Sequence, residues 1–465
     1  MSTLGPATNS PAMIERLIRA GMDVARLNLS YGTLEEHAQY IQTVRKLSKQ
    51  LERHVAILMD LPGPKYRIGN LKKGQGTLRK GTLIKLITGE IEGDVDLLPV
   101  NLPNLSQDVK EGDTILLADG AMGLRVETVT STGIKCRVTV GGQLKSGAGL
   151  VVPRRHLSAP FITESMREDL NFAAKQHPDY LALSFVSDAE DINSVKEILR
   201  GENAEIAIMS KIEREEAVRH FKRILAVSDA IMVARGDLGV EIPLEKVPLV
   251  QKEIIYQCNR AGKPVVTATE MLESMVNSVR PTRAEATDVA SAIFDGTDAL
   301  MLSAETSIGK YPVQSVTMMA KIARVIENKL PYELLLTERG DWIEPETDEL
   351  ISYNACHTAY RLGAAAIVAY TQSGSTARRV SKYRPRVPIL ALTPSRDIYS
   401  RLILCWGVYP VKIPMPSTVE EMFATASTLA KDLGLARARD LIVITAGIPT
   451  GQAGTTNMLK VERIN

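Results

Sequence analysis

Two neighbouring segments decide the fold: A-E-I-A-I-M-S-K-I-E at 204–213 and D-A-I-M-V-A-R-G-D at 229–237. The apolar residues 204–209 and 230–233 have the length of buried strands, and a polar segment of helical length separates them. A strand, a helix and a second strand in this order are typical of a parallel sheet.

Each of these two strands passes directly into charged residues. Lys211 and Glu213 follow the first, and Arg235 and Asp237 follow the second. Two carboxylates beside an ammonium suit Mg²⁺, because this ion takes one or two carboxylates and keeps its other positions for water and substrate oxygens. Backbone N–H groups from Gly236 onward would meet a substrate carboxylate at a helix N-terminus. Two unrelated surface clusters are the alternative.

The same alternation extends in both directions along the chain. A short strand at 1–4, helices near 11–20 and 34–51, and strands near 22–30 and 54–60 come before it. Strands Y-L-A-L-S-F-V, P-V-V-T-A-T and A-L-M-L-S-A complete the series after residue 160. Eight strands with helices between them predict a (β/α)8 TIM barrel, in which reacting groups sit at the carboxyl ends of the strands. Those ends carry Arg26, Asn28, Asp60, Lys211, Glu213, Asp237, Thr269 and Glu305.

Two further domains are expected around the barrel, which occupies 1–61 and 156–335. Residues 62–155 show short alternating runs between Gly-rich turns, which indicates an inserted small β-barrel or sandwich. A polar linker is expected at 337–347, and strand-length runs within 345–465 predict a C-terminal α/β domain. The loop T-Q-S-G-S-T at 371–376 lies between a strand and a helix, where it is either a phosphate site or an ordinary turn.

Composition narrows the class of protein. The 465 residues are 45% hydrophobic and 24% charged with a net charge of +2, so nucleic acid is not expected as a main partner. Four widely spaced cysteines suggest neither a zinc site nor a disulfide framework, and a reducing cytoplasmic setting fits them. No secretion signal and no membrane-spanning run is apparent.

Long strings of the chain resemble one family, pyruvate kinase. They are A-G-M-D-V-A-R-L-N-L-S, S-K-I-E, I-M-V-A-R-G-D-L-G-V-E-I-P, T-A-T-E-M-L-E-S-M, R-P-T-R-A-E, D-G-T-D-A-L-M-L-S-A-E-T, G-K-Y-P and, in the third domain, Y-R-P-R-V-P-I and A-G-T-T-N. The resemblance runs from residue 3 to 464 and includes the domain order. It implies phosphoryl transfer from phosphoenolpyruvate to ADP, giving pyruvate and ATP in glycolysis, with Mg²⁺ or Mn²⁺ as cofactor.

The resemblance also implies roles for individual residues. Glu213 and Asp237 would bind the metal, and Lys211 would stabilise charge on the transferring group and the enolate. Arg26 and Arg67 would contact the phosphate. Thr269 would lie on the face where the enolate is protonated, and the segment Ala234, Arg235, Gly236 and Asp237 would hold the substrate carboxylate. The inserted domain would close over the site as a lid.

One departure concerns the monovalent cation. Many members have D-T-K-G-P-E-I-R-T after the third strand, and there a K⁺ ion sits among positions that match Asn28, Ser30, Asp60 and Leu61. This chain has D-L-P-G-P-K-Y-R-I, with Lys65 in place of the Glu. The combination resembles the K⁺-independent branch, because a tethered ammonium supplies the monovalent charge. We therefore expect a requirement for Mg²⁺ but not for K⁺.

Other departures concern the nucleotide side, the lid and the start of the barrel. The chain has Tyr31 where the family often has His, and Gly147 with Ala148 where it often has two Lys, which leaves nucleotide specificity open. The lid motif D-D-G appears as A-D-G with only Asp119. The family usually has several more residues before G-P, so either the start is truncated or misassigned or the first strand is short.

Three hypotheses about the function follow. The leading hypothesis is a pyruvate kinase. A decarboxylase or aldolase acting on a 2-keto acid at the same enolate site is an alternative motivated by the altered nucleotide side, and a non-catalytic metabolite sensor is another. The third-domain loop with Thr371, Ser373, Gly374, Ser375 and Thr376 resembles the family's effector loop, and 447–457 resembles the bacterial form of the opposite loop. A bacterial homotetramer controlled by a phosphorylated metabolite is the corresponding expectation.

Overall fold

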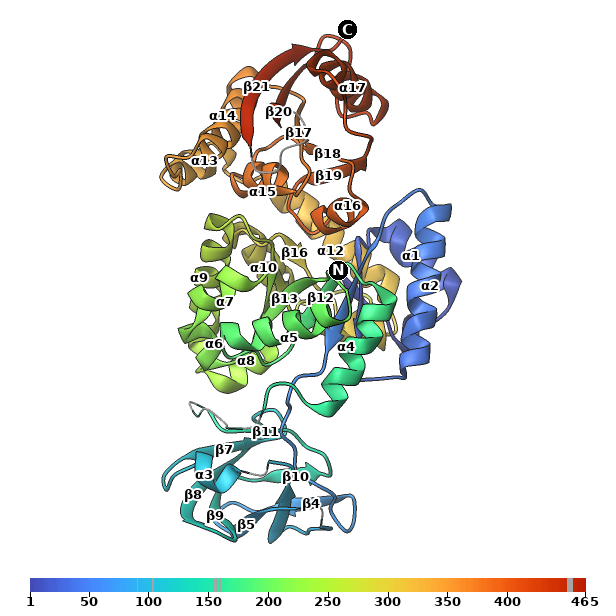
Figure 1. Ribbon diagram of the computed structural model, residues 1–465. Helices are drawn as coiled ribbons and strands as arrows, with labels where there is room; N and C mark the ends of the chain where they lie inside the picture. The colour runs from blue at the N-terminus through green and yellow to red at the C-terminus, as the bar shows by residue number, and fades with distance from the viewer. Residues whose placement is uncertain (90, 103, 154, 156–157, 159, 450–454) are drawn as a thin grey trace.

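A closed parallel barrel forms the middle of the molecule (Figure 1). The computed structural model describes residues 1–465 except 90, 103, 154, 156–157, 159 and 450–454. In the described part of the chain the barrel sheet has eight strands, all paired in parallel with their neighbours, and Ser2 closes the ring by pairing with Leu302. The strands are β1 (Ser2–Thr3), β2 (Val24–Asn28), β3 (Ala56–Leu61), β12 (Tyr180–Leu183), β13 (Ala207–Ile212), β14 (Ala230–Ala234), β15 (Val265–Ala268) and β16 (Ala299–Leu300). The expected TIM barrel is confirmed, with a short first strand.

Helices cover the outside of the barrel because the longer ones have an apolar stripe that packs on the strands. Thr33 and Thr282 begin two of them with reciprocal capping boxes, in which Glu36 and Glu285 close the first turn. The helices are α1 (Pro11–Ala20), α2 (Leu34–Gln50), α4 (Glu164–Gln176), α5 (Ala189–Gly201), α6 (Glu215–Arg219), α7 (Phe221–Val227), α8 (Arg235–Glu241), α9 (Val247–Arg260), α10 (Arg283–Asp295), α11 (Ala304–Ser307) and α12 (Pro312–Glu327), with short 3₁₀ turns η1 (Pro6–Thr8), η2 (Leu244–Lys246) and η3 (Glu273–Val276).

An inserted β domain leaves the barrel after β3 and returns before α4. It contains a six-stranded sheet in the order β11-β7-β8-β9-β5-β6 and a two-stranded pair, β10 with β4, among the described residues. Its own apolar core is separate from that of the barrel. The elements are β4 (Gln75–Leu78), β5 (Leu83–Thr88), β6 (Leu97–Val100), α3 (Leu105–Asp108), β7 (Thr114–Leu117), β8 (Met122–Thr130), β9 (Gly133–Val140), β10 (Gly142–Lys145) and β11 (Leu150–Val151).

The C-terminal domain is a sheet flanked by helices, as expected. Its strand order is β19-β18-β17-β20-β21, parallel except for the antiparallel pair β20 and β21. The edge strand β21 was not predicted. The elements are α13 (Tyr332–Gly340), α14 (Thr347–Leu362), β17 (Ala366–Tyr370), α15 (Ser375–Lys382), β18 (Ile389–Thr393), α16 (Arg396–Leu402), β19 (Val408–Lys412), α17 (Val419–Asp432), β20 (Leu441–Gly447) and β21 (Thr456–Arg463).

The prediction of a polar linker over 337–347 is wrong for its first part. Helix α13 runs to Gly340, and the Arg339 side chain is buried. Its guanidinium donates to Asn259 Oδ1 at 3.1 Å and to the carbonyl of Lys382, and it stacks over Trp342. Arg339 therefore takes part in a buried contact between domains, although the other polar residues of the segment are exposed.

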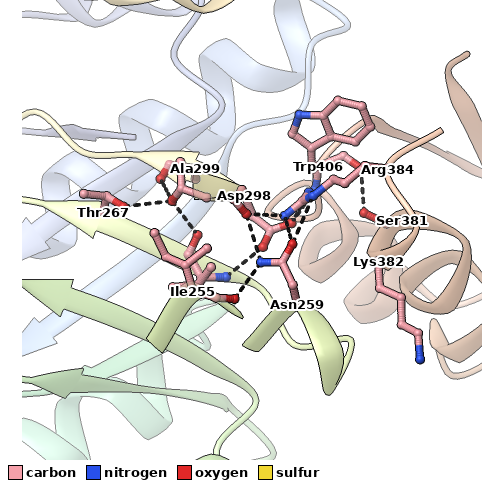
Figure 2. A network of polar contacts seen from close by, with 12 residues as sticks. Ile255, Asn259, Thr267, Asp298, Ala299, Ser381, Lys382, Arg384 and Trp406 are labelled. Atoms are coloured by element: carbon pink, nitrogen blue, oxygen red, sulfur yellow. Dashed lines mark hydrogen bonds and ion pairs between the residues drawn. The ribbon is translucent and has the colours of Figure 1, made fainter. Parts of the chain in front are cut away.

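A network of buried polar contacts joins the barrel to the C-terminal domain (Figure 2). Arg384 Nη1 donates to Asp298 Oδ1 at 2.8 Å, and its other nitrogens reach Asn259 Oδ1 and the carbonyl of Gly296. The second oxygen of Asp298 accepts from the backbone of Val265, the first residue of β15. The C-terminal domain thus contacts the amino ends of barrel strands, and Figure 1 places the inserted domain on the opposite side. Nowhere in the described ranges is a helix both long and apolar enough to cross a membrane.

Candidate active site

A buried ladder of charges lies where β2, β3 and β13 end. Arg26 donates to Asp60 Oδ2 through Nε at 2.7 Å, and its Nη2 lies 2.6 Å from the same oxygen. Lys211 Nζ donates to Asp60 Oδ1 at 3.1 Å and lies 2.9 Å from Glu213 Oε1. Strand β13 extends further than the apolar run predicted, so Lys211 lies inside the strand and Glu213 directly follows it. The structure therefore brings together four of the predicted site residues.

Burial and charge oppose each other in this ladder. Burial would raise the pKa of Asp60, but the charges of Arg26 and Lys211 outweigh it and hold the pKa below its ordinary value. Burial would lower the pKa of Lys211, and the carboxylates of Asp60 and Glu213 raise it above its ordinary value. The site therefore presents a fixed ammonium, with little water around it, where positioned charges act most strongly.

The carboxylates Glu213 and Asp237 form the acidic side of the site. Glu213 Oε2 accepts from the backbone N–H of Phe185 at 2.7 Å. Burial raises the pKa of Glu213, Lys211 partly offsets this, and the charge of Asp237 raises it further. Asp237 lies in the first turn of α8 and is only partly covered. A divalent cation bound between these two carboxylates would offset the repulsion between them.

The donor set fits a magnesium ion better than a closed metal site. Across the described residues, no group of three or more His, Cys, Asp or Glu side chains is arranged to hold a metal. Glu213 and Asp237 supply hard oxygen donors, and Mg²⁺ is commonly bound by one or two carboxylates with water and substrate oxygens completing its shell. These two residues are the ones that would hold it.

The segment after β14 meets the segment after β15 at the rim. Gly236 N–H donates to Thr269 Oγ1 at 2.9 Å. Thr269 and Glu270 have φ angles of +65° and +53°, a left-handed conformation that is uncommon for residues with a side chain. Arg235 turns away from the site, with Nη1 2.7 Å from Asp288 Oδ1 and Nη2 donating to the carbonyl of Thr269 at 2.7 Å. Arg235 thus braces the rim, whereas Thr269 lies beside Ala234–Asp237.

The residues expected around a monovalent cation divide into two places. Leu61 is fully buried, and Asn28 Oδ1 accepts from the backbone of Ser30 at 3.2 Å. Lys65 points elsewhere: its Nζ lies 3.1 Å from Asp119 Oδ1 in the inserted domain and 3.5 Å from Asp237 Oδ1. The ammonium therefore approaches the acidic side of the site.

Arg67 is exposed on the inserted domain. Its Nη1 donates to the carbonyl of Gly147 at 2.9 Å, and its backbone N–H donates to Asn101 Oδ1. These contacts lie within the inserted domain, so in this arrangement Arg67 is not part of the ladder around Asp60.

A cavity of about 950 Å³ opens beside the ladder. This volume is ample for a small-molecule ligand. Tyr31 and Ile308 line it, and both side chains are largely exposed. Arg26 and Asn28 form its inner wall, which makes the cavity continuous with the predicted phosphate contact.

The loop predicted to bind an effector joins β17 to α15. Gly374 caps the helix with a φ of +82°, and Ser373 Oγ donates to Ser375 Oγ at 3.1 Å. The Thr376 hydroxyl lies 2.7 Å from that of Thr456 on β21, and the Thr371 hydroxyl is buried. The opposite loop at 447–457 lies partly outside the described residues.

Sequence reasoning missed three residues that hold the ladder in place. Ser184 Oγ accepts from Lys211 Nζ at 2.6 Å and donates to Asp60 Oδ1 at 3.3 Å. A Cβ on Gly63 would lie 2.4 Å from the Ser184 carbonyl oxygen. Thr3 Oγ1 accepts from Arg26 Nη1 at 2.9 Å. Thr3 ends β1 and Ser184 directly follows β12, so a search for polar residues at every strand end would have identified both. Glu305 was predicted at a strand end but lies in α11, where it accepts from the backbone of Leu272 and Ser303 and is structural.

Comparison with known proteins agrees with this geometry. The family model described as pyruvate kinase, barrel domain, matches residues 1–316, and the one described as pyruvate kinase, alpha/beta domain, matches residues 349–462. The chain is 46% identical over 464 residues to the pyruvate kinases of Staphylococcus aureus strains MRSA252, USA300 and NCTC 8325. Each alignment covers 99% of this chain and 79% of the relative.

Proposed function

The chain belongs to the pyruvate kinase family, a family of phosphotransferases, and we propose that it transfers the phosphoryl group of phosphoenolpyruvate to ADP with Mg²⁺. The observation that carries the proposal is the buried ladder of Arg26, Asp60, Lys211 and Glu213 with Asp237 at its edge. In this reaction the bond between phosphorus and the enol oxygen breaks, a bond to the terminal oxygen of ADP forms, and the enolate carbon takes up a proton.

The charge of each site residue determines its proposed role in the reaction. Mg²⁺, when held by Glu213 and Asp237, would offset the negative charge that gathers on the phosphoryl group and the enolate. Lys211 stabilises the same charge from a position that Asp60 fixes, so no reorganisation is needed during the reaction. Arg26 orients the phosphate beside the cavity, and Arg67 joins it when the inserted domain closes.

The rim supports substrate orientation. The segment Ala234–Asp237 holds the substrate carboxylate, and Thr269 lies on the side from which the enolate is protonated, through water. ADP occupies the cavity of about 950 Å³, with Tyr31 against the nucleoside. Closure of the inserted domain excludes water, which otherwise takes the phosphoryl group.

The test is pyruvate formation from phosphoenolpyruvate, measured with and without ADP and with and without Mg²⁺. We expect turnover only when both are present, and a loss of at least about a hundredfold in Lys211→Met, because one charge-stabilising group is removed. Lys222→Met, on the exposed surface of α7, is the matched control. Product formation from a 2-keto acid without nucleotide would instead favour the decarboxylase or aldolase alternative, and no turnover on either substrate would favour a sensor.

We further propose that the enzyme does not need K⁺. The Lys65 ammonium, 3.5 Å from Asp237, supplies the monovalent positive charge that the ion supplies in other members. Wild-type turnover in tetramethylammonium buffer is expected to match that in K⁺ buffer. Lys65→Glu is expected to lose activity and to recover part of it when K⁺ is added. A strict K⁺ requirement of the wild type would contradict this proposal.

The remaining proposals concern the regulation, the oligomeric state and the cellular location of the protein. The loop 371–376 is proposed to bind a phosphorylated metabolite, because it offers hydroxyls at the start of α15. We propose a cytoplasmic homotetramer that works in glycolysis and responds cooperatively to phosphoenolpyruvate. Analytical ultracentrifugation measures the oligomeric state, which is expected to be a tetramer. A hyperbolic saturation curve that sugar phosphates and nucleoside monophosphates leave unchanged would contradict the regulatory proposal.

A further inference from the structure

One ion-paired group spans the gap between the inserted domain and the barrel. Lys65 belongs to the connection that follows β3, and its Nζ donates to Asp119 Oδ1 at 3.1 Å. The same nitrogen lies 3.5 Å from Asp237 Oδ1 at the start of α8. Lys65 is about one quarter exposed and Asp237 about one third, whereas Asp119 is 70% exposed, so solvent screens the contact with Asp119 more than the contact with Asp237.

The backbone conformation of the turn that carries Asp119 sets the direction of its side chain. Ala118, Asp119 and Gly120 follow one another with φ angles of +50°, +53° and +88°. Two residues with side chains in the left-handed region are costly, so such a turn persists where its surroundings hold it. The Ala118 N–H donates to the carbonyl of Gly149 at 2.9 Å, which ties the turn to the returning strand of the inserted domain.

Two glycines, Gly149 and Gly120, lie where this turn meets its partners. A Cβ on Gly149 would lie 3.2 Å from Asp119 Oδ1 and 3.2 Å from Lys65 Cε, so a side chain there would crowd the pair. A Cβ on Gly120 would lie 3.6 Å from Val240 in α8, so the turn rests on the helix that also carries Asp237. The turn therefore contacts the barrel through both packing and charge.

We propose that Asp119 and Lys65 form a tether between the inserted domain and α8, and that Asp119 is a positioning residue for Lys65. By drawing the ammonium toward the inserted domain, Asp119 limits how closely Lys65 pairs with Asp237. Asp237 then remains available to a divalent cation. The part of the inference that concerns the cation rests on the proposed function, whereas the tether itself does not.

The first experiment measures the tether without metal, substrate or nucleotide. All four native cysteines are buried, so spin labels attach selectively to Ser131→Cys in the inserted domain and Lys175→Cys in α4. We expect one narrow distance distribution in the wild-type background and a broader one, extending to longer distances, in Asp119→Asn and in Lys65→Met. An unchanged distance distribution in Asp119→Asn would overturn the tether. Because this measurement uses no substrate, its result does not depend on whether the protein forms pyruvate.

The second experiment measures Mn²⁺ affinity by electron paramagnetic resonance. Asp119→Asn leaves Lys65 with Asp237 as its ion-pair partner, so the dissociation constant should rise about two- to fivefold, as for a partly exposed ion pair. Lys65→Met removes the competing ammonium, so the dissociation constant should fall by a similar factor.

The double variant decides whether Asp119 acts through Lys65. Asp119→Asn should change nothing further in a Lys65→Met background. Asp96→Asn, an exposed carboxylate of the inserted domain, controls for loss of charge, and circular dichroism checks that each variant is folded. If Asp119→Asn shifts Mn²⁺ affinity equally in both backgrounds, or in neither, the positioning role is refuted.

Discussion

Asp60→Asn is the substitution that most sharply tests the physical account of the ladder. The change keeps the shape of the side chain and removes its charge. Arg26 then loses contacts of 2.7 and 2.6 Å from Nε and Nη2, and Lys211 loses an ion pair at 3.1 Å. Because both cations are buried, neither regains solvation without a local rearrangement.

The expected magnitude follows from what remains around each cation. Lys211 keeps Glu213 at 2.9 Å, and Arg26 keeps the Thr3 hydroxyl at 2.9 Å. Breaking a buried ion pair typically costs about 3–5 kcal/mol, and the retained amide oxygen favours the lower end, about 3 kcal/mol. For a barrel of this size that corresponds to a melting temperature lower by about 6–12 °C.

The assay is thermal unfolding followed by circular dichroism, with Asp23→Asn as the matched control. Asp23 pairs with Arg53 at 3.5 Å on the exposed surface, where the same change should cost under about 1 kcal/mol. The folded-state pKa of Asp60 is lowered, so its stabilisation is present above the unfolded-state pKa and is lost as the pH falls through the folded-state pKa. Equal losses in the two variants at pH 7 would refute the reasoning.

Three further outcomes follow from other parts of the molecule. Burial raises the pKa of Asp169 to about 6, so the folded state holds this proton more tightly than the unfolded chain and stability falls as the pH rises between about 4 and about 6. Asp169→Asn should remove that fall and be more stable at pH 7 by about 1–2 kcal/mol in urea titrations, and identical pH profiles would contradict this. Arg384→Ala leaves Asp298 without its ion pair at the domain interface and should cost about 3 kcal/mol, seen as earlier melting and faster proteolysis between the domains. Gly63→Ala places a Cβ against the Ser184 carbonyl and should lower kcat by displacing the ladder, with wild-type kcat as the contradicting result.

The barrel was predictable because its strands are short apolar runs that end in charged residues. The β13 run and the β14 run each led directly to site residues, and parallel strands place such ends at one rim. The predicted polar linker failed because Arg339 is polar in sequence but buried in a contact between domains, and periodicity does not distinguish these cases.

The charged residues of the site could be predicted from the sequence, but the residues that hold them in place could not. Lys211 and Glu213 stand out from an apolar run, whereas Ser184 is one of many serines and its role depends on the packing of two strands. The side-chain direction of Lys65 could not be predicted from the sequence either, because it depends on the turn at Asp119, which lies 54 residues further along the chain. Contacts between segments far apart in the chain require the fold.

The most direct measurement is ³¹P NMR of phosphoenolpyruvate and ADP with Mg²⁺ and the wild-type enzyme, in a buffer free of K⁺ and Na⁺. The account predicts that the phosphoenolpyruvate resonance is replaced by the three resonances of ATP, and that Lys211→Met leaves the spectrum almost unchanged on the same timescale. If no ATP forms with the wild type even after K⁺ is added, or if Lys211→Met forms ATP at the wild-type rate, the proposed reaction at this site is contradicted.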